Sequence, residues 1–161
     1  MQLEHRDLQI LDLLQRDSRL SNQDLAERVG MSTSACWRRV RALEEAGVIR
    51  GYRAEIDPRQ AGLAFHAIIH VRLVRHAREI VERFVAEVMR HEEVQDCYAT
   101  TGSADYHLRV LCRDLDAFND FMERTLFRLE GIANIQTNLV LRHIKAPGTG
   151  ADGRQGAQGQ K

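Results

Sequence analysis

Arginines gather in the stretch from Ser21 to Gly47, which reads SNQDLAERVGMSTSACWRRVRALEEAG. Residues 33–46 contain nothing that breaks a helix, and they follow Ser32, a residue type that caps helix starts well. On a helical wheel one side of this helix is apolar and consists of Cys36, Val40, Leu43 and Gly47. The opposite side is polar and consists of Ser34, Arg38, Arg41 and Glu45, with Trp37 on one flank and Arg39 at the edge of the apolar stripe.

A second, shorter helix is expected just before it, over residues 22–29. Ser21 and Asp24 have the spacing of a capping box, and Gly30 suits a left-handed helix exit. Two helices joined by a tight turn, the second presenting arginines outward, indicate a helix-turn-helix whose second helix enters a DNA major groove. The guanidinium group matches both guanine edges and phosphate oxygens.

An Arg-rich helix face can also be merely solvated, since Glu44 and Glu45 can pair with arginines one turn away. The net charge is zero, with 23 basic and 23 acidic side chains, so DNA binding needs a local excess of positive charge. That excess is supplied by Arg38, Arg39, Arg41, Arg50 and Arg53. Oligomerisation would multiply it by adding half-sites.

Composition is that of an ordinary globular protein, with 43% hydrophobic and 29% charged residues. No apolar run is long enough to cross a bilayer, and MQLEHRDLQ does not have the form of a signal peptide, so we expect no membrane association and a cytoplasmic location. Cys36, Cys97 and Cys112 show no C-x-x-C spacing and are expected to be reduced thiols. Neither a metal site nor a cofactor is predicted.

A first helix is predicted from an Asp7 cap to Arg16, with an apolar stripe that buttresses the helix-turn-helix. The stripe consists of Leu8, Leu11 and Leu14, broadened by Ile10 and Leu13. After Gly47 the segment VIRGYRAEID suits a wing or a strand that leads away, and Asp57-Pro58 ends the domain.

From Ala64 onward the pattern predicts strand, helix, strand, strand, helix, strand, over residues 64–74, 77–91, 94–101, 106–113, 115–129 and 132–144. Right-handed crossovers force this order into an antiparallel four-stranded sheet with both helices on one side, a ferredoxin-like plait. The fold class is therefore α+β. The apolar residues of the uncovered sheet face need a cover, for which a second copy of the chain is expected.

A glycine, hydroxyls and a carboxylate lie within six residues at the turn Thr101, Gly102, Ser103, Ala104, Asp105 and Tyr106. Backbone N–H groups of such a turn can hold a carboxylate, and Asp105 can meet an ammonium group, which together suit an amino acid. Alternatively, Gly102 only provides a left-handed turn that Asp105 caps.

The stretches LSNQDLAERVGMSTSACWRRVRALEEAGVIRGY, CYATTGSADYHLRV and MERTLFRLEGI resemble the Lrp/AsnC, or feast/famine, family of transcription regulators, over residues 7–145. The resemblance implies a winged helix-turn-helix DNA-binding domain at residues 1–53, a linker at 54–63, an αβ-plait effector and oligomerisation domain at 64–145, and a disordered tail at 146–161. It also implies a homodimer that assembles into a tetramer or octamer, and a small amino acid or related metabolite bound between subunits. The implied effector contacts are Gly102, Asp105, Thr125, Phe127, Asn138 and Leu139, of which Phe127 and Asn138 depart from the leucine-responsive pattern.

The favoured hypothesis is a regulator that binds double-stranded DNA and is not an enzyme. Arg38 and Arg41 would read bases beside Ser34. The phosphate contacts would be Thr33, Arg39, Arg50 and Arg53, and Ser32 and Trp37 complete the predicted interface. One alternative is an enzyme that resembles tetrapyrrole (siroheme) decarboxylases and uses His66, His70 and His107. A passive architectural DNA protein without an effector is the other.

Overall fold

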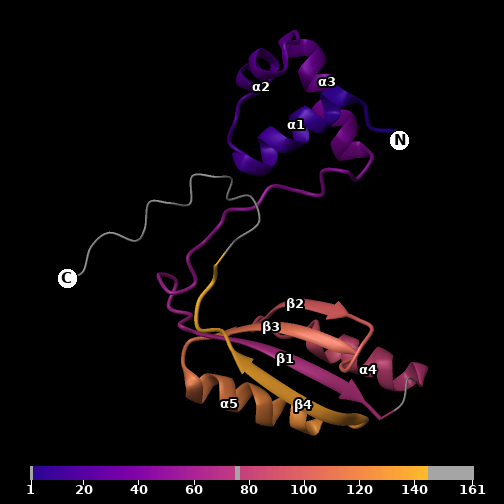
Figure 1. Ribbon diagram of the computed structural model, residues 1–161, viewed down its shortest axis with the longest axis vertical. Coiled ribbons are helices and arrows are strands. Elements are labelled where there is room, and N and C mark those ends of the chain that lie inside the picture. The colour runs from indigo at the N-terminus through magenta and orange to yellow at the C-terminus, as the bar shows by residue number, and fades with distance from the viewer. Residues whose placement is uncertain (1, 75–76, 145–161) are drawn as a thin grey trace, which may run out of the picture. The chain divides into compact units, whose positions relative to one another are not determined.

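The chain forms two compact units, one holding the described residues up to Glu55 and the other comprising Ile56–His143 (Figure 1). The computed structural model describes residues 2–74 and 77–144. Each unit has a hydrophobic core of its own, so each can be described by itself. Within the described ranges, no helix has the length and apolar character needed to cross a bilayer. The predicted tail at residues 146–161 lies outside these ranges.

Helix α1, His5–Arg16, begins before the predicted cap. Asp7 lies inside the first turn, where its carboxylate accepts a hydrogen bond from Glu4 N–H at 2.8 Å, so the prediction that Asp7 is the N-cap is wrong. Ile10 is fully buried, whereas Leu8 is 53% exposed. The buried stripe is therefore centred on Ile10 rather than on the line that runs through Leu8.

Helices α2, Asn22–Val29, and α3, Thr33–Glu45, confirm the predicted helix-turn-helix. Ser21 caps α2 by accepting a hydrogen bond from Asp24 N–H, and Gly30 ends it with a φ of 62°. That left-handed conformation costs little only for glycine. The apolar side of α3 is buried as predicted at Cys36, Val40 and Leu43, although Gly47 is exposed.

The segment after α3 differs from the prediction of a wing. Residues 48–57 form no strand in the structure. A lone β-like segment needs a partner strand to satisfy its backbone N–H and C=O groups, and the described part of this unit contains none. The segment is instead an extended connection to the second unit.

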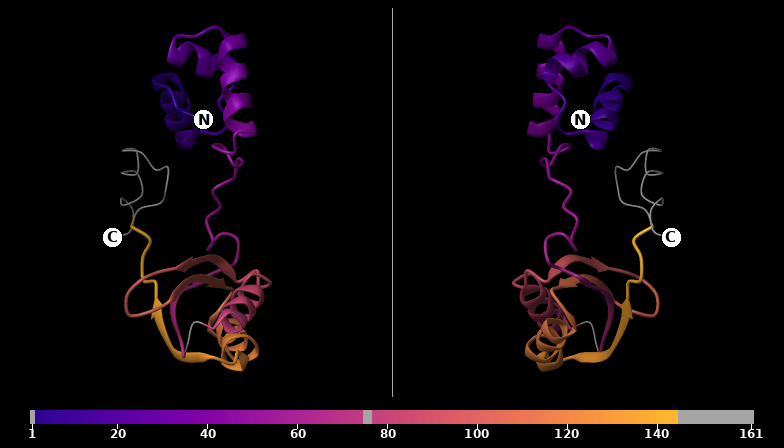
Figure 2. Two further views of the ribbon diagram at one scale, coloured as in Figure 1. Left: turned by 90° about the vertical axis from the view of Figure 1, so that its right-hand side faces the viewer. Right: turned by 90° about the vertical axis from the view of Figure 1, so that its left-hand side faces the viewer.

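The second unit contains a four-stranded antiparallel sheet with the strand order β2-β3-β1-β4. Its elements are β1 (Phe65–Leu73), α4 (Arg78–Val88), β2 (Val94–Ala99), β3 (Tyr106–Cys112), α5 (Leu115–Arg124), the 3-10 turn η1 (Leu126–Arg128) and β4 (Ile132–Leu139). Both helices lie on the same side of the sheet, which confirms the predicted plait (Figure 2).

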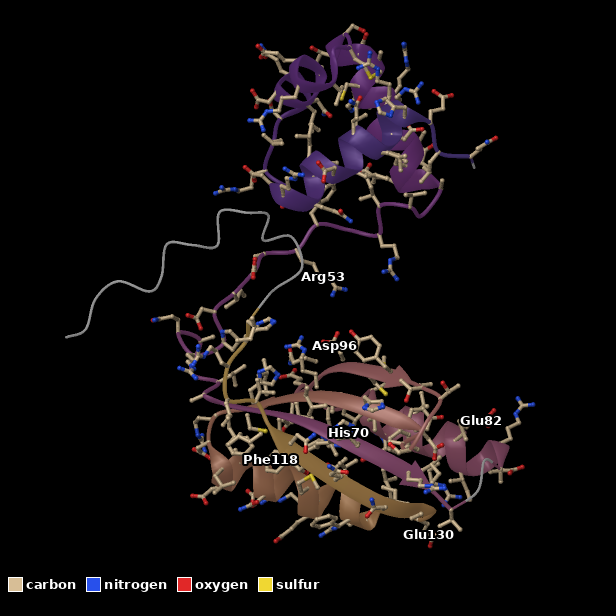
Figure 3. The ribbon with its side chains drawn as sticks, viewed as in Figure 1. Arg53, His70, Glu82, Asp96, Phe118 and Glu130 are labelled. Atoms are coloured by element: carbon tan, nitrogen blue, oxygen red, sulfur yellow. The ribbon has the colours of Figure 1, made fainter. Side chains whose placement is uncertain are left out.

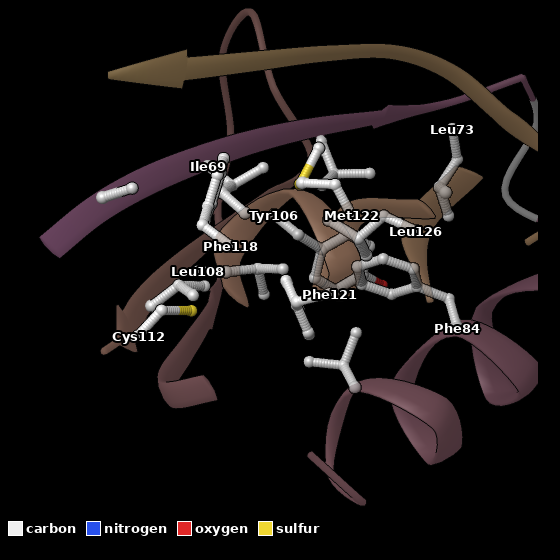
Figure 4. Close-up of a cluster of buried hydrophobic side chains, with 14 residues drawn as sticks. Ile69, Leu73, Phe84, Tyr106, Leu108, Cys112, Phe118, Phe121, Met122 and Leu126 are labelled. Atoms are coloured by element: carbon white, nitrogen blue, oxygen red, sulfur yellow. The ribbon is translucent and has the colours of Figure 1, made fainter. Parts of the chain in front are cut away.

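Side chains alternate along the two central strands as the period of a strand requires. The core is formed on one face by Ala67, Ile69, Val71 and Leu73 of β1 and by Tyr106, Leu108, Val110 and Cys112 of β3 (Figure 4). Phe118 and Phe121 of α5 and Phe84 of α4 pack against them. All eight strand positions were predicted to form two such rows.

Some element ends and buried positions were predicted wrongly. Helix α5 stops at Arg124 and is followed by η1, and β4 stops at Leu139, opposite Ala67 of β1. Leu115 is 54% exposed and Val85 is 38% exposed, although helical spacing assigned both to the core. Each lies at the margin of an apolar stripe, where spacing alone does not distinguish the core from its rim.

The side of the sheet that the helices leave uncovered is termed the open sheet face. Strand register assigns to it His66, Ile68, His70, Arg72, Asp96, Tyr98, His107, Arg109, Leu111, Asn134, Gln136 and Asn138. Ile68, Leu111 and Tyr98 are the only members of this set that are not a charged residue, a histidine or an amide. The face is thus more polar than the expected patch of apolar residues.

Gly131, with a φ of 90°, precedes β4 and lies close to α4. A Cβ atom there would come within 2.6 Å of Ile80 Cγ2, so Gly131→Ala adds a clash to an unfavourable backbone conformation. We expect it to lower the free energy of unfolding of the second unit by about 2–5 kcal/mol, measured by urea unfolding with far-UV circular dichroism.

Gly62→Ala is the matched control, because Gly62 also has a positive φ, of 83°, but has no atom within 4 Å of the added Cβ. It should cost only about 1–2 kcal/mol. Trp37 is the single tryptophan and lies in the first unit, so the midpoint of its fluorescence should stay unchanged in both variants. Equal losses for the two glycines would contradict the close packing at Gly131.

Candidate DNA interface and ligand site

The polar side of α3 faces solvent as the sequence predicts. Ser34, Arg38 and Arg41 are exposed. Arg41 lies 3.6 Å from Glu45 in a pair whose side chains are 59% and 69% exposed. Such a surface pair contributes little and can be exchanged for a phosphate or a base. Among the described residues, Arg38 has no carboxylate within ion-pair distance.

Arg39 has another role in this structure. Its guanidinium donates a hydrogen bond to Asp7 Oδ1 at 2.8 Å and also pairs with Glu4. The Asp7 side chain is almost fully buried, and these contacts join the first turn of α1 to the middle of α3. The predicted phosphate contact is thus occupied by two carboxylates within the chain.

The environment of Asp7 favours its ionised form. Burial alone would raise its pKa, but the Glu4 N–H group and the Arg39 guanidinium outweigh it, and the pKa is lowered below 3.8. A lowered pKa in the folded state means that the stabilisation is present above the unfolded pKa of about 3.9 and is lost as the pH falls through the folded value. The contact between α1 and α3 is therefore complete at neutral pH.

Trp37, on the flank of α3, is 52% exposed. It borders a hollow of about 210 Å³ whose other lining residues are Leu14, Ser18, Leu20, Asn22, Leu25, Val40, Arg41, Glu44 and Tyr52. Tyr52 donates a hydrogen bond to Glu44 Oε1 at 2.9 Å, which fixes the segment after α3 against the helix. Sequence reasoning missed Tyr52, for which only its position in the Gly-Tyr pair gave a signal.

The remaining predicted DNA contacts flank α3. Ser32 accepts a hydrogen bond from Ala35 N–H and so caps the helix, and Thr33 is exposed in its first turn. Arg50 and Arg53 are exposed on the extended segment that follows, and Arg53 is labelled in Figure 3. The start of α3 and both of these arginines thus present donors that suit phosphate oxygens.

The turn between β2 and β3 exposes Thr101, Gly102 and Ser103. Gly102 has a φ of 120°, in the region that favours glycine. Thr100 Oγ1 donates to the Ala104 carbonyl at 3.1 Å, and Thr100 N–H donates to the Asp105 carbonyl at 2.9 Å. These bonds hold the turn in one shape with its hydroxyls and backbone facing outward.

Asp105 ties this turn to the end of β1. Its carboxylate accepts a hydrogen bond from Leu73 N–H at 2.8 Å, and its own N–H donates to the Val71 carbonyl at 2.9 Å. The first of these bonds lies where the pairing of β1 with β4 shifts register, between Arg72 and Leu73. Asp105 therefore positions the turn, and its predicted contact with an ammonium group stays a prediction.

Two other predicted ligand residues lie in the core. Tyr106 is 8% exposed, and its ring lies 4.7 Å from that of Phe84. Burial raises the pKa of its phenol, with further contributions from Cys97 and Asp105. Thr125 is 2% exposed, and its hydroxyl lies 3.2 Å from Nε2 of His91. Neither side chain faces the exposed part of the turn.

The last three predicted ligand residues lie elsewhere on the surface. Phe127, in η1, is 63% exposed, and Leu139 is 54% exposed. Asn138 and Leu139 pair with Ile68 and Ala67, which lie three and four residues along β1 from Val71, the residue beside the turn. These separations are roughly 10 and 13 Å along the strand. A single chain therefore does not bring the predicted ligand residues together.

The histidines of the enzyme alternative all lie on the open sheet face. His70 and His107 contact each other, and His66 Nε2 is buried without a hydrogen-bond partner. Burial lowers the pKa of His66, and Arg109 and His143 lower it further. In the described part of the chain, no three His, Cys, Asp or Glu side chains are arranged to hold a metal ion.

Two family matches cover both units. The winged helix-turn-helix DNA-binding family matches residues 3–50, and the Lrp/AsnC ligand binding domain matches residues 66–149. The chain belongs to the Lrp/AsnC family. It is a DNA-binding transcriptional regulator with a ligand-binding domain, as the sequence resemblance implied.

Known members of the Lrp/AsnC family are similar over most of the chain. The leucine-responsive regulatory proteins of Salmonella typhimurium and Escherichia coli K12 are each 36% identical over 143 residues, which is 89% of this chain and 87% of theirs. A Neisseria meningitidis transcriptional regulator, solved as a complex with L-Met, is 39% identical with a TM-score of 0.85, and the match covers 91% of this chain and 94% of that one.

The solved AsnC of E. coli is 25% identical with a TM-score of 0.81, over 91% of this chain and 97% of its own. These Lrp/AsnC relatives are transcriptional regulators and not enzymes, which decides against the decarboxylase alternative. The open-face histidines are left without a catalytic role.

A double-mutant cycle tests the contact between Arg39 and Asp7. Arg39→Gln leaves the buried carboxylate without its cation, so the unfolding midpoint of the first unit should fall by several degrees at pH 7. In an Asp7→Asn background the same change should have a much smaller effect. Thermal unfolding followed by Trp37 fluorescence measures both.

Acid provides the second arm of this test. Because the lowered pKa of Asp7 makes its stabilisation disappear in acid, the wild type should approach the stability of Asp7→Asn below about pH 4. A cycle with no coupling at pH 7 would contradict the structural role of Arg39.

Proposed function

We propose that this regulator reads DNA with Arg38 and Arg41 of α3, with Ser34 beside them. The observation that carries this proposal is the burial of the opposite side of the helix at Cys36, Val40 and Leu43, which leaves the guanidinium side to solvent. An exposed arginine on a recognition helix can donate two hydrogen bonds to the edge of a guanine.

Phosphate contacts are assigned to the backbone and side chains around that helix. Ser32 and Thr33 stand at its N-terminus, where helix N–H groups attract anions, and Arg50 and Arg53 extend the contact beyond its end. Trp37 lies on the flank and contributes an apolar surface. Arg39 is reassigned from phosphate binding to holding α3 against α1, because both of its partners are carboxylates of the same chain.

A homodimer provides two such helices. The chain has no net charge, so one helix-turn-helix has little electrostatic attraction for DNA beyond its local arginines. The open sheet face suits a second copy of itself, since Asp96 pairs with Arg109 and, of the open-face residues assigned above, only Arg72 then adds a formal charge, so no large excess of one charge opposes pairing. Dimers would assemble further into a tetramer or octamer.

The ligand is proposed to be a small amino acid or a related metabolite. The exposed turn Thr101, Gly102 and Ser103 offers backbone N–H groups and hydroxyls for a carboxylate. Because Asn138 and Leu139 lie three and four residues along β1 from this turn in one chain, a contact that they make with the same ligand would come from another subunit. The Neisseria relative that binds L-Met makes methionine the first ligand to test.

Regulation then follows from binding between subunits. A ligand that contacts two chains binds one assembly geometry better than another, and it thereby shifts the geometry in which the DNA-binding units are presented. We place this regulator in the cytoplasm, where its DNA and its nutrient ligands meet.

Substituting arginines on and beside α3 separates base reading from phosphate binding. Arg38→Ala should reduce the preference for a selected DNA sequence over a scrambled one by about 10- to 100-fold, because a guanine loses its bidentate partner. Arg53→Ala should weaken both DNAs about equally and reduce the salt slope of binding by about 1. Fluorescence anisotropy with sequences selected from a random pool measures both.

Arg124→Ala is the matched control for these two variants, since Arg124 is exposed, pairs with Asp120 and lies in the other unit. Its affinity and specificity should equal those of the wild type. If Arg38→Ala bound both DNAs as the wild type does, α3 would not be the reading helix.

A thermal-shift screen of the common amino acids tests the ligand proposal. Methionine and other small neutral amino acids should raise the unfolding midpoint in a concentration-dependent manner, because a ligand that binds only the folded state stabilises it. Ser103→Ala should reduce that shift, whereas Ser18→Ala, in the first unit, should not. A screen in which no amino acid shifts the midpoint would favour an architectural protein without an effector.

A further inference from the structure

Two histidines face each other at the centre of the open sheet face. His70 of β1 and His107 of β3 are direct cross-strand partners, and their Nδ1 atoms lie 2.6 Å apart. The rings meet edge to face, with centroids 4.6 Å apart, and both side chains are partly buried (His70 is labelled in Figure 3). A contact this short requires that one nitrogen donates and the other accepts.

Asn138 of β4 determines which nitrogen carries the proton. Its Nδ2 lies 3.0 Å from Nε2 of His70, and because an amide nitrogen only donates, that ring nitrogen accepts. His70 therefore carries its proton on Nδ1 and donates it to His107. Gln136 Nε2 donates in turn to Asn138 Oδ1 at 3.5 Å. In this arrangement the four side chains form one directed chain of hydrogen bonds that needs no added proton on either ring.

Added protons disrupt this chain in two stages. A proton added to His70 makes its Nε2 a donor that opposes the Asn138 amide N–H group. A proton added to His107 removes the acceptor for His70 Nδ1. In both cases Asn138 must turn its amide and lose the hydrogen bond from Gln136. A second proton places two N–H groups opposite each other at the contact between the rings. The contact between the rings therefore accommodates at most one added proton, and a second proton is excluded while the rings stay in contact.

The charged and titratable neighbours of the pair oppose protonation more than they assist it. On the open sheet face, β1 contributes His66 and Arg72, β3 contributes Arg109, and β2 contributes Asp96 and Tyr98. The residues of β4 there are amides. Asp96, the one carboxylate, is already paired with Arg109. The helices lie on the other side of the sheet (Figure 2).

We propose that self-association through the open sheet face is linked to protons: two chains pair while His70 and His107 are neutral, and each chain takes up at least one proton when they separate in acid. This inference rests on the proposed dimer interface and adds its regulation. A second copy would remove the pair from water, where an imidazolium can be hydrated, so association favours the neutral rings. When two chains associate, the protons that their histidines release pass to solvent.

The experiment measures dissociation of the full chain from pH 8 to pH 5.5, in EDTA to remove metal ions. Energy transfer between chains labelled at the amino terminus and diluted to nanomolar concentration gives the Kd. For two protons per dimer, Kd should rise by about 100-fold per pH unit once the pH is below the range in which imidazoles titrate. Circular dichroism at each pH checks that the separated chains remain folded.

Variants assign the effect to the pair. His70→Gln with His107→Gln leaves neutral amides at every pH, so its Kd should change by less than about threefold across the range. The matched control is His5→Gln, an exposed histidine of the first unit, which should retain the wild-type slope.

The outcomes separate this inference from the proposal on which it depends. A wild-type dimer whose Kd ignores pH, or a double variant that keeps the full slope, would overturn the proton linkage and leave the dimer in place. A chain that stays monomeric at every pH would overturn the interface and the linkage together.

Discussion

The rotation of α3 about its own axis is the constraint on which the DNA-binding half depends. Cys36, Val40 and Leu43 are buried against a core that includes Ile10 of α1 and Leu25 of α2. Only the opposite side can then reach a groove, and Arg39 at the edge of the buried stripe is held by Asp7. Packing and one partly buried ion pair thus decide which guanidinium groups of α3 face solvent.

In the described part of the chain, each of the two units has a hydrophobic core of its own. The coupling that we propose passes through assembly. In this proposal a second chain is needed by three features. They are the turn at Gly102, the residues Phe127 and Asn138, and the histidine pair of the open sheet face. Association of two chains would then depend on both the ligand concentration and the pH.

Sequence periodicity predicted the helix-turn-helix and the two core rows of the sheet. Apolar side chains at helical or strand spacing lie on one side of the element, and that side is the one that becomes buried. Sequence periodicity was less successful for side chains whose role is set by a contact with a residue distant in the sequence. Asp7 has the residue type of a cap, but its role depends on Arg39, 32 positions away in the sequence. Asp105 was predicted as a ligand contact, and the sequence could not show that its carboxylate also accepts a hydrogen bond from Leu73 N–H, a contact set by strand register. The sequence could likewise not show that Tyr106 and Thr125 are buried, because it does not reveal which side of a turn or helix end is covered.

The most direct test of this account follows the arginine side chains of the full chain by NMR while a DNA sequence selected by the protein is added. The Nε–H signals of Arg38 and Arg41 should shift and become protected from exchange, whereas that of Arg39 should keep its position because it remains bound to Asp7. A large shift at Arg39 with none at Arg38 would mean that α3 meets DNA with another face, and it would contradict the account.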